Sequence, residues 1–122
     1  MRTKIFGIIL AATFVLSACK TSTTADTSYT NVKKAISSSD VVLVDVRTPE
    51  QYSQGTADNA INIPLADIQA KAESLKGKKV VVFCNKGIQA DEAFKILKKK
   101  GVDVYDGTSL QNVKAIQDRA IN

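Results

Sequence analysis

The sequence predicts an α/β fold in which helices cover both faces of a parallel sheet. Short apolar runs, typical of strands buried on both faces, alternate along the chain with segments whose apolar residues recur at helical spacing. Glycine or proline separates most of these segments. Strands that alternate with helices are joined by right-handed crossovers, which make the strands parallel and place helices on both faces.

The first predicted elements are a helix, a strand and a second, short helix. Residues 31–37 favour a helix with one apolar face, and residues 41–46 form an apolar run that only Asp45 interrupts. Residues 48–51 (Thr-Pro-Glu-Gln) combine an N-cap, a proline at the first helical position and a capping box. We expect the helix that begins there to end near Gly55.

A strand, a helix and a further strand follow. Residues 60–63 predict a short strand that Pro64 ends, because proline cannot donate to a sheet. Residues 65–75 carry apolar side chains at helical spacing, and Gly77 closes that helix. Residues 79–83 are apolar after the first position and predict a third, buried strand.

The last third of the chain predicts helix, strand and helix. The first helix has a buried stripe and ends at Gly101; the stripe consists of Ala90, Ala93, Phe94 and Leu97. Residues 102–105 predict the last strand. Ser109 is the N-cap of a final helix that extends to about Arg119.

Cys84 is the candidate nucleophile. It follows the third predicted strand and precedes a glycine-containing loop, residues 85–89, that leads directly into a helix. Backbone N–H groups of such a loop surround the sulfur, and with the positive end of the helix dipole they favour a thiolate. In parallel sheets ligands bind beyond the carboxyl ends of the strands, where Cys84 lies. The fold and the cysteine therefore predict the same site.

Composition narrows the class of protein. A chain of 122 residues is long enough for one compact domain and too short for two. The formal net charge of +5 is mildly basic and does not indicate a nucleic-acid partner. The absence of histidine excludes His-dependent triads and histidine-rich metal sites. We expect no metal ion and no organic cofactor.

The N-terminus has the features of a bacterial secretory signal. Two basic residues precede an apolar stretch, residues 5–16, that is too short to span a bilayer. Residues 16–19 (Leu-Ser-Ala-Cys) resemble a lipobox, which implies cleavage before Cys19 and a diacylglycerol on its sulfur. Residues 1–18 are then a lipoprotein signal peptide. An ordinary signal peptide cut nearby, or an N-terminal membrane anchor, is the alternative.

The boundaries of the tether and of the folded domain follow from the interpretation of residues 1–18 as a signal peptide. Residues 19–28 lack apolar periodicity and predict a lipidated tether, with the folded domain over residues 29–122. Lysine rather than aspartate follows Cys19, which predicts outer-membrane sorting and a periplasmic domain in a Gram-negative cell, or otherwise a domain outside the cell. If Cys19 is acylated, Cys84 has no disulfide partner, and a lone thiol in an oxidising compartment indicates function or burial. A disulfide between the two is the alternative.

Three motifs resemble those of rhodanese domains, in the same order and spacing. They are residues 44–52 (Val-Asp-Val-Arg-Thr-Pro-Glu-Gln-Tyr), 60–64 (Ala-Ile-Asn-Ile-Pro) and 82–87 (Val-Phe-Cys-Asn-Lys-Gly). The resemblance covers nearly the whole chain after residue 30 and is strongest to small single-domain periplasmic rhodaneses of the phage-shock type. It implies one rhodanese-like domain with sulfurtransferase activity. Cys84 would take the outer sulfur of thiosulfate, become a persulfide, and pass that sulfur to cyanide or a thiol acceptor.

The loop residues suit this chemistry. Because thiosulfate is an anion, its pocket needs hydrogen-bond donors, for which the candidates are the backbone N–H groups of Asn85, Lys86, Gly87, Ile88, Gln89 and Ala90. Gly87 permits the loop to curl, since a positive φ is accessible to glycine without strain. Lys86 is the only cationic side chain of the loop and the candidate for attracting thiosulfate. A solvated surface lysine is the alternative.

Asp45 and Arg47 match positions near the active site of the family, where the arginine orders neighbouring loops. We expect a salt bridge from Arg47 to Asp45 or Glu50 that supports the fold. Three segments depart from the family pattern. Residues 55–59 (Gly-Thr-Ala-Asp-Asn) lack the usual His-Ile after the glycine and the Pro-Gly before the second strand. Residues 86–89 lack the arginine of many rhodanese loops, which bears on rate and donor preference, and Gly107-Thr108 replaces a common Gly-Gly.

Other functions fit the sequence less well. Cysteine phosphatases use a related loop but need an arginine at its end to bind phosphate oxygens, where this chain has Gln89 and Ala90. A dithiol redox role needs a second cysteine near Cys84. A low-activity sulfur-binding or protein-interaction module is the main alternative, although such modules commonly lack the cysteine. We therefore expect a monomeric enzyme, tethered to a membrane, that acts on a small anionic sulfur donor and a thiophilic acceptor.

Overall fold

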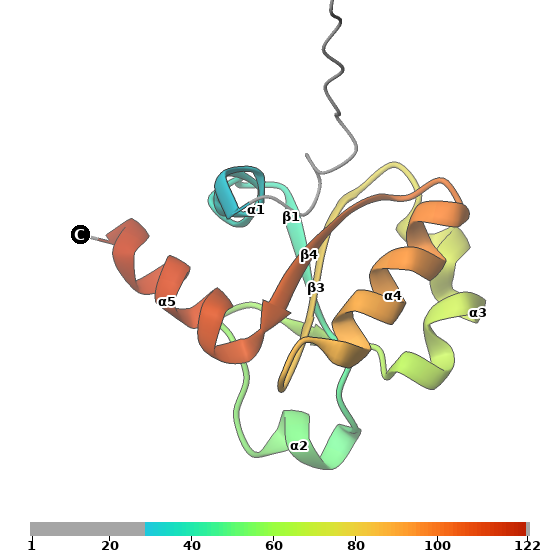
Figure 1. Ribbon diagram of the computed structural model, residues 1–122, viewed down its shortest axis with the longest axis horizontal. Coiled ribbons are helices and arrows are strands. Elements are labelled where there is room, and N and C mark those ends of the chain that lie inside the picture. The colour runs from blue at the N-terminus through green and yellow to red at the C-terminus, as the bar shows by residue number, and fades with distance from the viewer. Residues whose placement is uncertain (1–28, 122) are drawn as a thin grey trace, which may run out of the picture.

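The computed structural model describes residues 29–121 (Figure 1) and confirms the predicted α/β architecture. The signal peptide and the tether with Cys19 lie outside the described residues. In chain order the elements are α1 (Tyr29–Ile36), β1 (Val41–Asp45), α2 (Pro49–Ser53), β2 (Ile61–Asn62), α3 (Leu65–Leu75), β3 (Lys79–Cys84), α4 (Ile88–Lys99), β4 (Asp103–Ser109) and α5 (Leu110–Ile121).

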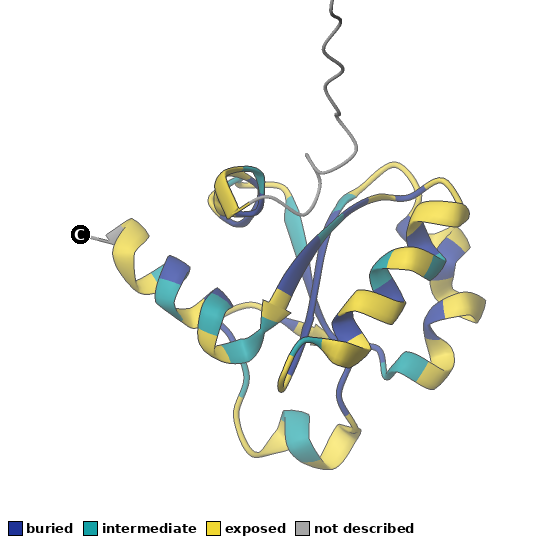
Figure 2. Ribbon diagram, in the orientation of Figure 1, coloured by how far each residue is buried: buried dark blue, intermediate teal, exposed yellow. Residues whose placement is uncertain are grey.

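The strands within this range form one parallel sheet in the order β2-β1-β3-β4. Helices α3 and α4 pack on one face of the sheet, and α1 and α5 pack on the other, as Figure 1 shows. Successive side chains of β3 alternate between these two cores, with Val80, Val82 and Cys84 on the α3–α4 side and Val81 and Phe83 on the α1–α5 side. Figure 2 shows that β3 is buried along most of its length. The continuous apolar run is explained by this central position.

The predicted capping box of α2 is present. Thr48 Oγ1 accepts a hydrogen bond from Gln51 N at 3.2 Å, and Gln51 Oε1 accepts one from Thr48 N at 3.4 Å. Helix α3 has the predicted bounds. The cap of α5 is also as predicted, because Ser109 Oγ accepts a hydrogen bond from Asn112 N at 3.0 Å. These short-range signals were therefore sufficient to place the starts of α2 and α5.

The last strand is longer than the predicted residues 102–105. Between Val82 and Cys84, β3 advances two residues while β4 advances three, from Asp106 to Ser109, so β4 contains a bulge. Aspartate and glycine are common in turns, so the residue types at positions 106 and 107 do not indicate that the strand continues past Tyr105. Gly107 fits because a Cβ there would lie only 2.8 Å from Val81 Cγ1.

Two other boundaries differ from the prediction. Helix α1 begins at Tyr29, two residues early, where the tyrosine hydroxyl accepts a hydrogen bond from Arg119 of α5. Strand β2 is limited to Ile61–Asn62, because Ala60 N donates to Ala57 O in a turn and is not part of the ladder. No helix between residues 29 and 121 is both long and apolar enough to cross a membrane.

Helix α4 follows the predicted pattern with one exception. Its first residue is Ile88, and Ala90, Ala93 and Leu97 are buried as expected. Phe94 is only half-buried, and the ammonium group of Lys98 lies 5.9 Å from the centroid of its ring. The phenylalanine therefore packs at the edge of the core, where a lysine side chain covers it.

Candidate active site

Cys84 ends the central strand β3 at the carboxyl edge of the sheet. Its side chain is buried, with a relative exposure of 1%, and it is a free cysteine. The sulfur accepts hydrogen bonds from Gly87 N at 3.1 Å and from Ala90 N at 3.3 Å. Backbone N–H groups of the loop and of the first turn of α4 thus point at the sulfur, which is the arrangement that the sequence predicted for this strand–loop–helix.

The shape of the loop depends on Gly87, which is the N-cap of α4. Its φ of 96° lies in the left-handed region, so the chain can turn and point N–H groups back toward Cys84. Thr108, in the bulge of β4, lies beside it, since a Cβ on Gly87 would be 3.7 Å from Thr108 Cβ. Thr108 itself has a φ of 63°, which is unfavourable for a β-branched residue, and it is at a position where the resemblance noted in the sequence implies glycine.

The remaining predicted loop residues surround the opening of the site. A cavity of about 260 Å³ is lined by Cys84, Asn85, Lys86, Ile88 and Gln89. Of these, only the cysteine is buried, and the other four side chains are exposed. The sulfur is thus at the base of a small pocket whose rim carries one cation and one large apolar side chain. We call this pocket the cradle.

Arg47 and Asp45 form a buried ion pair beside the cradle. The Arg47 guanidinium donates to both carboxylate oxygens of Asp45, with Nε–Oδ1 at 2.9 Å and Nη2–Oδ2 at 2.7 Å. Nη2 also donates to Gly55 O at 2.7 Å, and Thr56 Oγ1 donates to Asp45 Oδ2 at 2.8 Å. Of the two partners that the sequence left open, the structure selects Asp45 rather than Glu50. The pair ties the end of β1 to the loop that follows α2.

The contacts of Arg47 keep its guanidinium positively charged. The hydrogen bond to Asp45 raises the pKa of Arg47, and the negative charge of a Cys84 thiolate adds a smaller effect in the same direction. Strand β1 neighbours β3, and Val46 N donates to Phe83 O at 2.9 Å. The ion pair therefore supports the strand ends on which Cys84 is positioned.

Asp106 is a buried carboxyl that the sequence analysis did not identify. It is 7% exposed, and its Oδ1 accepts a hydrogen bond from Thr108 N at 2.9 Å. Burial raises its pKa, the hydrogen bond from Thr108 opposes this effect, and the charge of Asp91 raises the pKa further. Val102 and Val104 alternate with the less buried Asp103 and Tyr105, and this alternation was the signal that could have placed position 106 on the buried face of the strand.

We expect Asp106→Asn to stabilise the domain at pH 7 and to have little effect at pH 3. The folded state holds the Asp106 proton more tightly than the unfolded state, so the carboxyl favours folding below its ordinary pKa of 3.8. That contribution is lost as the pH rises through the raised pKa of the folded state. The asparagine oxygen can still accept from Thr108 N. Urea unfolding midpoints at both pH values measure the effect, and an equal shift at both would contradict it.

The groups gathered at the site are suited to chemistry on sulfur. Within residues 29–121, no three His, Cys, Asp or Glu side chains are grouped so that they could hold a metal ion. The groups present are a buried sulfur, two N–H donors from a helix N-terminus and a nearby cation, Lys86. This combination defines the class: an α/β domain with a buried cysteine whose sulfur accepts hydrogen bonds from backbone N–H groups of a loop and helix N-terminus.

Comparisons with known proteins identify the family within this class. Residues 28–108 match the rhodanese-like domain, and the chain belongs to that family. Over 81 residues it is 38% identical to the thiosulfate sulfurtransferase PspE of Escherichia coli, covering 64% of this chain and 73% of that protein. It is 31% identical over 80 residues to a tRNA uridine(34) hydroxylase from Aster yellows witches'-broom phytoplasma, covering 59% of this chain and only 26% of that enzyme.

A solved structure shows the same fold. A rhodanese with anions from E. coli superimposes with a TM-score of 0.55 and 37% sequence identity, covering 59% of this chain and 89% of that one. The fold and family implied by the three sequence motifs are therefore confirmed.

Proposed function

We propose that this protein is a sulfurtransferase that uses thiosulfate as its donor and carries the sulfur as a persulfide on Cys84. The observation that carries the proposal is the position of Sγ, which lies at the end of β3 and accepts hydrogen bonds from Gly87 N and Ala90 N. The same donors that stabilise the thiolate can stabilise the anionic outer sulfur of the persulfide. The similarity to PspE and to a rhodanese solved with anions supports the choice of donor.

The first half of the reaction follows from the charges in the site. The Cys84 thiolate attacks the outer sulfur of thiosulfate, and a bond forms between Sγ and that sulfur. The sulfur–sulfur bond of thiosulfate breaks, and sulfite leaves with the electron pair. The total charge is unchanged, because a thiolate and a dianion become an anionic persulfide and a sulfite dianion.

Lys86 is proposed to attract the donor, which carries two negative charges. Its side chain is exposed on the rim of the cradle, where it can act on an approaching anion before contact. We further propose that the domain is held at the cell envelope by a lipid on Cys19, facing the periplasm or the outside of the cell. The residues 16–19 that resemble a lipobox support this proposal.

Donor specificity tests both the reaction and the role of Lys86. Thiocyanate formation from cyanide is measured with thiosulfate and with an organic persulfide as donors. Lys86→Gln is expected to raise the KM for thiosulfate about threefold at low salt, because one exposed charge contributes this much attraction. The effect should disappear at high ionic strength.

Lys100→Gln is the matched control, because Lys100 is exposed at the far end of α4. It is expected to leave the KM unchanged. Thiocyanate formation from the organic persulfide alone would overturn thiosulfate as the donor. An unaltered KM in Lys86→Gln would show that Lys86 is a solvated surface lysine and does not attract thiosulfate.

A further inference from the structure

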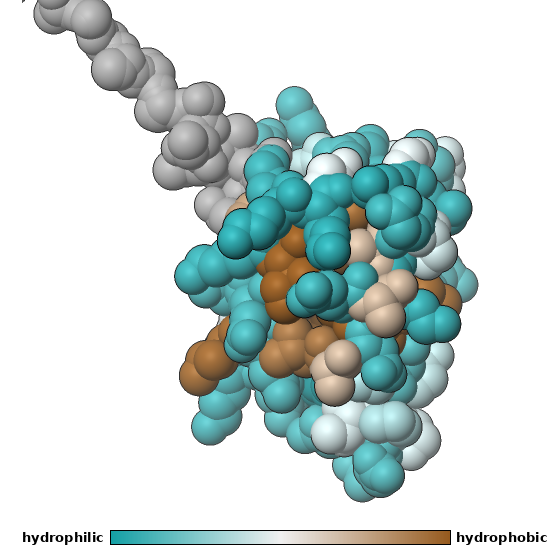
Figure 3. All heavy atoms as spheres, turned by 90° about the vertical axis from the view of Figure 1, so that its right-hand side faces the viewer, coloured by the Kyte–Doolittle hydropathy of each residue, from teal (hydrophilic) through white to brown (hydrophobic). Residues whose placement is uncertain are grey.

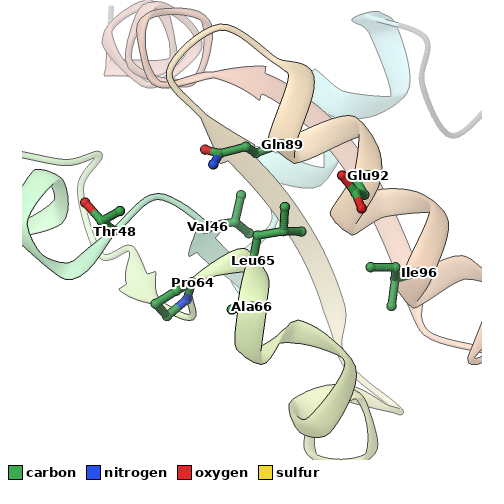
Figure 4. Close-up of a pocket in the computed structure, with 8 residues that line it drawn as sticks. All are labelled: Val46, Thr48, Pro64, Leu65, Ala66, Gln89, Glu92 and Ile96. Atoms are coloured by element: carbon green, nitrogen blue, oxygen red, sulfur yellow. The ribbon is translucent and has the colours of Figure 1, made fainter.

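A groove lies next to the cradle, on the face of the sheet that α3 and α4 cover. Apolar side chains gather on this side of the molecule, as Figure 3 shows. The groove has a volume of about 480 Å³, within the usual range of ligand pockets, about 300–1,000 Å³. Figure 4 shows its walls on α3, α4 and the end of β1, and its apolar lining consists of Val46, Pro64, Leu65, Ala66 and Ile96.

The groove and the cradle share a residue. Gln89 lines both, and Gln89, Glu92 and Ile96 form one stripe along α4 that faces α3 (Figure 4). Since Cys84 is buried, any acceptor of its sulfur has to approach through the mouth of the cradle. An acceptor held in the groove would therefore be next to the reacting sulfur.

The chemistry of the groove does not suit the donor. Thiosulfate is a small dianion and gains nothing from an apolar wall. Glu92 is exposed and is the charged residue that lines the groove, so it repels anions there. The groove instead fits a partner with an apolar part and a positive charge.

Apolar surface also continues at the rim of the cradle. Ile88 is 76% exposed and lines the cradle but not the groove. Ile88 is four residues before Glu92 on α4, so the two side chains are neighbours on the helix surface, and Ile88 extends the apolar surface from the groove to the rim of the cradle. A small thiol has only one substituent, whereas a cysteine within a polypeptide extends in two directions from its sulfur. Apolar surface that extends from the groove to the rim of the cradle is longer than a small thiol can cover and favours the polypeptide.

We propose that the groove binds the sulfur acceptor, and that the acceptor is a protein cysteine flanked by apolar residues and by a basic residue that faces Glu92. This inference rests on the proposed sulfurtransferase function. The acceptor thiolate attacks the outer sulfur of the Cys84 persulfide, and a new sulfur–sulfur bond forms on the acceptor. The bond from that sulfur to Sγ breaks, and Cys84 leaves as the thiolate with the electron pair, so the thiolate charge passes from the acceptor to Cys84.

Three blocked pentapeptides with a central cysteine test the proposal. The basic peptide has leucine on both sides of the cysteine and lysine at both ends, the acidic peptide has glutamate at the ends, and the glycine peptide replaces the leucines of the basic one. Full-length protein is first loaded with one sulfur by thiosulfate. Loss of that sulfur is followed by intact mass, and each rate is divided by the rate with cyanide.

The basic peptide is expected to react about fivefold faster than the acidic peptide, as for one favourable ion pair. It should also be about fivefold faster than the glycine peptide, because leucine side chains are buried in the groove. Glu92→Lys should reverse the order of the basic and acidic peptides. Glu73→Lys is the matched control, because Glu73 is an exposed glutamate on α3 outside the groove, and it should keep the order.

Equal rates for the three peptides, or an unchanged order in Glu92→Lys, would overturn the proposal. A second variant tests the apolar wall independently: Ala66→Trp places a large side chain in the groove and should lower the peptide rate relative to cyanide. Equal rates for glutathione and the basic peptide would show that small thiols are the acceptors. If thiosulfate does not load Cys84, the proposed function fails instead, and an organic persulfide then loads the protein for the same comparison.

Discussion

Cys84→Ser is expected to lower thiocyanate formation from thiosulfate and cyanide by about a thousandfold or more, because the serine oxygen cannot carry the persulfide. The change is close to isosteric in a buried position, so the fold should remain intact. The N–H groups of Gly87 and Ala90 then face an oxygen atom instead of a sulfur atom. Steady-state thiocyanate formation, with circular dichroism to verify folding, measures the loss.

The other cysteine of the chain, Cys19, provides the matched control. Cys19→Ser is expected to leave sulfur transfer unchanged in detergent solution, since Cys19 precedes the folded domain in the sequence. A Cys84→Ser protein that still forms thiocyanate at the original rate would contradict the assignment of the nucleophile. Loss of activity in both variants would indicate that Cys19 takes part in the reaction.

Arg47→Met is expected to destabilise the domain by about 3–5 kcal/mol, the usual effect of removing one partner of a buried ion pair. Asp45 is fully buried, and the change removes three hydrogen bonds from the guanidinium to its carboxylate. The contact from Arg47 Nη2 to Gly55 O is lost as well. Chemical denaturation measures the free energy of unfolding.

A double variant separates the buried charge from simple loss of packing. Asp45→Leu combined with Arg47→Met replaces the ion pair with apolar side chains and is expected to recover much of the stability, because no charge remains buried alone. A double variant as unstable as Arg47→Met would show that the cost arises elsewhere. Sulfur loading of the refolded double variant then reports whether the ion pair also positions Cys84.

The part of the site near Cys84 could be predicted from sequence because its chemistry is local. Within six positions the chain leaves a strand, turns at a glycine and begins a helix. These local features determine where the N–H groups of Gly87 and Ala90 point. The capping box at Thr48 and the cap at Ser109 are also short-range interactions. The fold class followed from the alternation of strands and helices, which does not depend on the details of packing.

Features made by contacts between distant segments could not be predicted in the same way. The bulge in β4 depends on the register between Val82–Cys84 and Asp106–Ser109, which no local pattern in either strand reveals. The groove combines residues from α3, α4 and the segment after β1 that are as far apart in the chain as Val46 and Ile96, so it exists only in the folded domain.

The most direct test of the proposed reaction is the intact mass of the protein before and after incubation with thiosulfate. We predict a gain of one sulfur atom that is absent in Cys84→Ser and that cyanide removes as thiocyanate. A folded protein whose Cys84 can be alkylated but that gains no sulfur would contradict persulfide formation from thiosulfate.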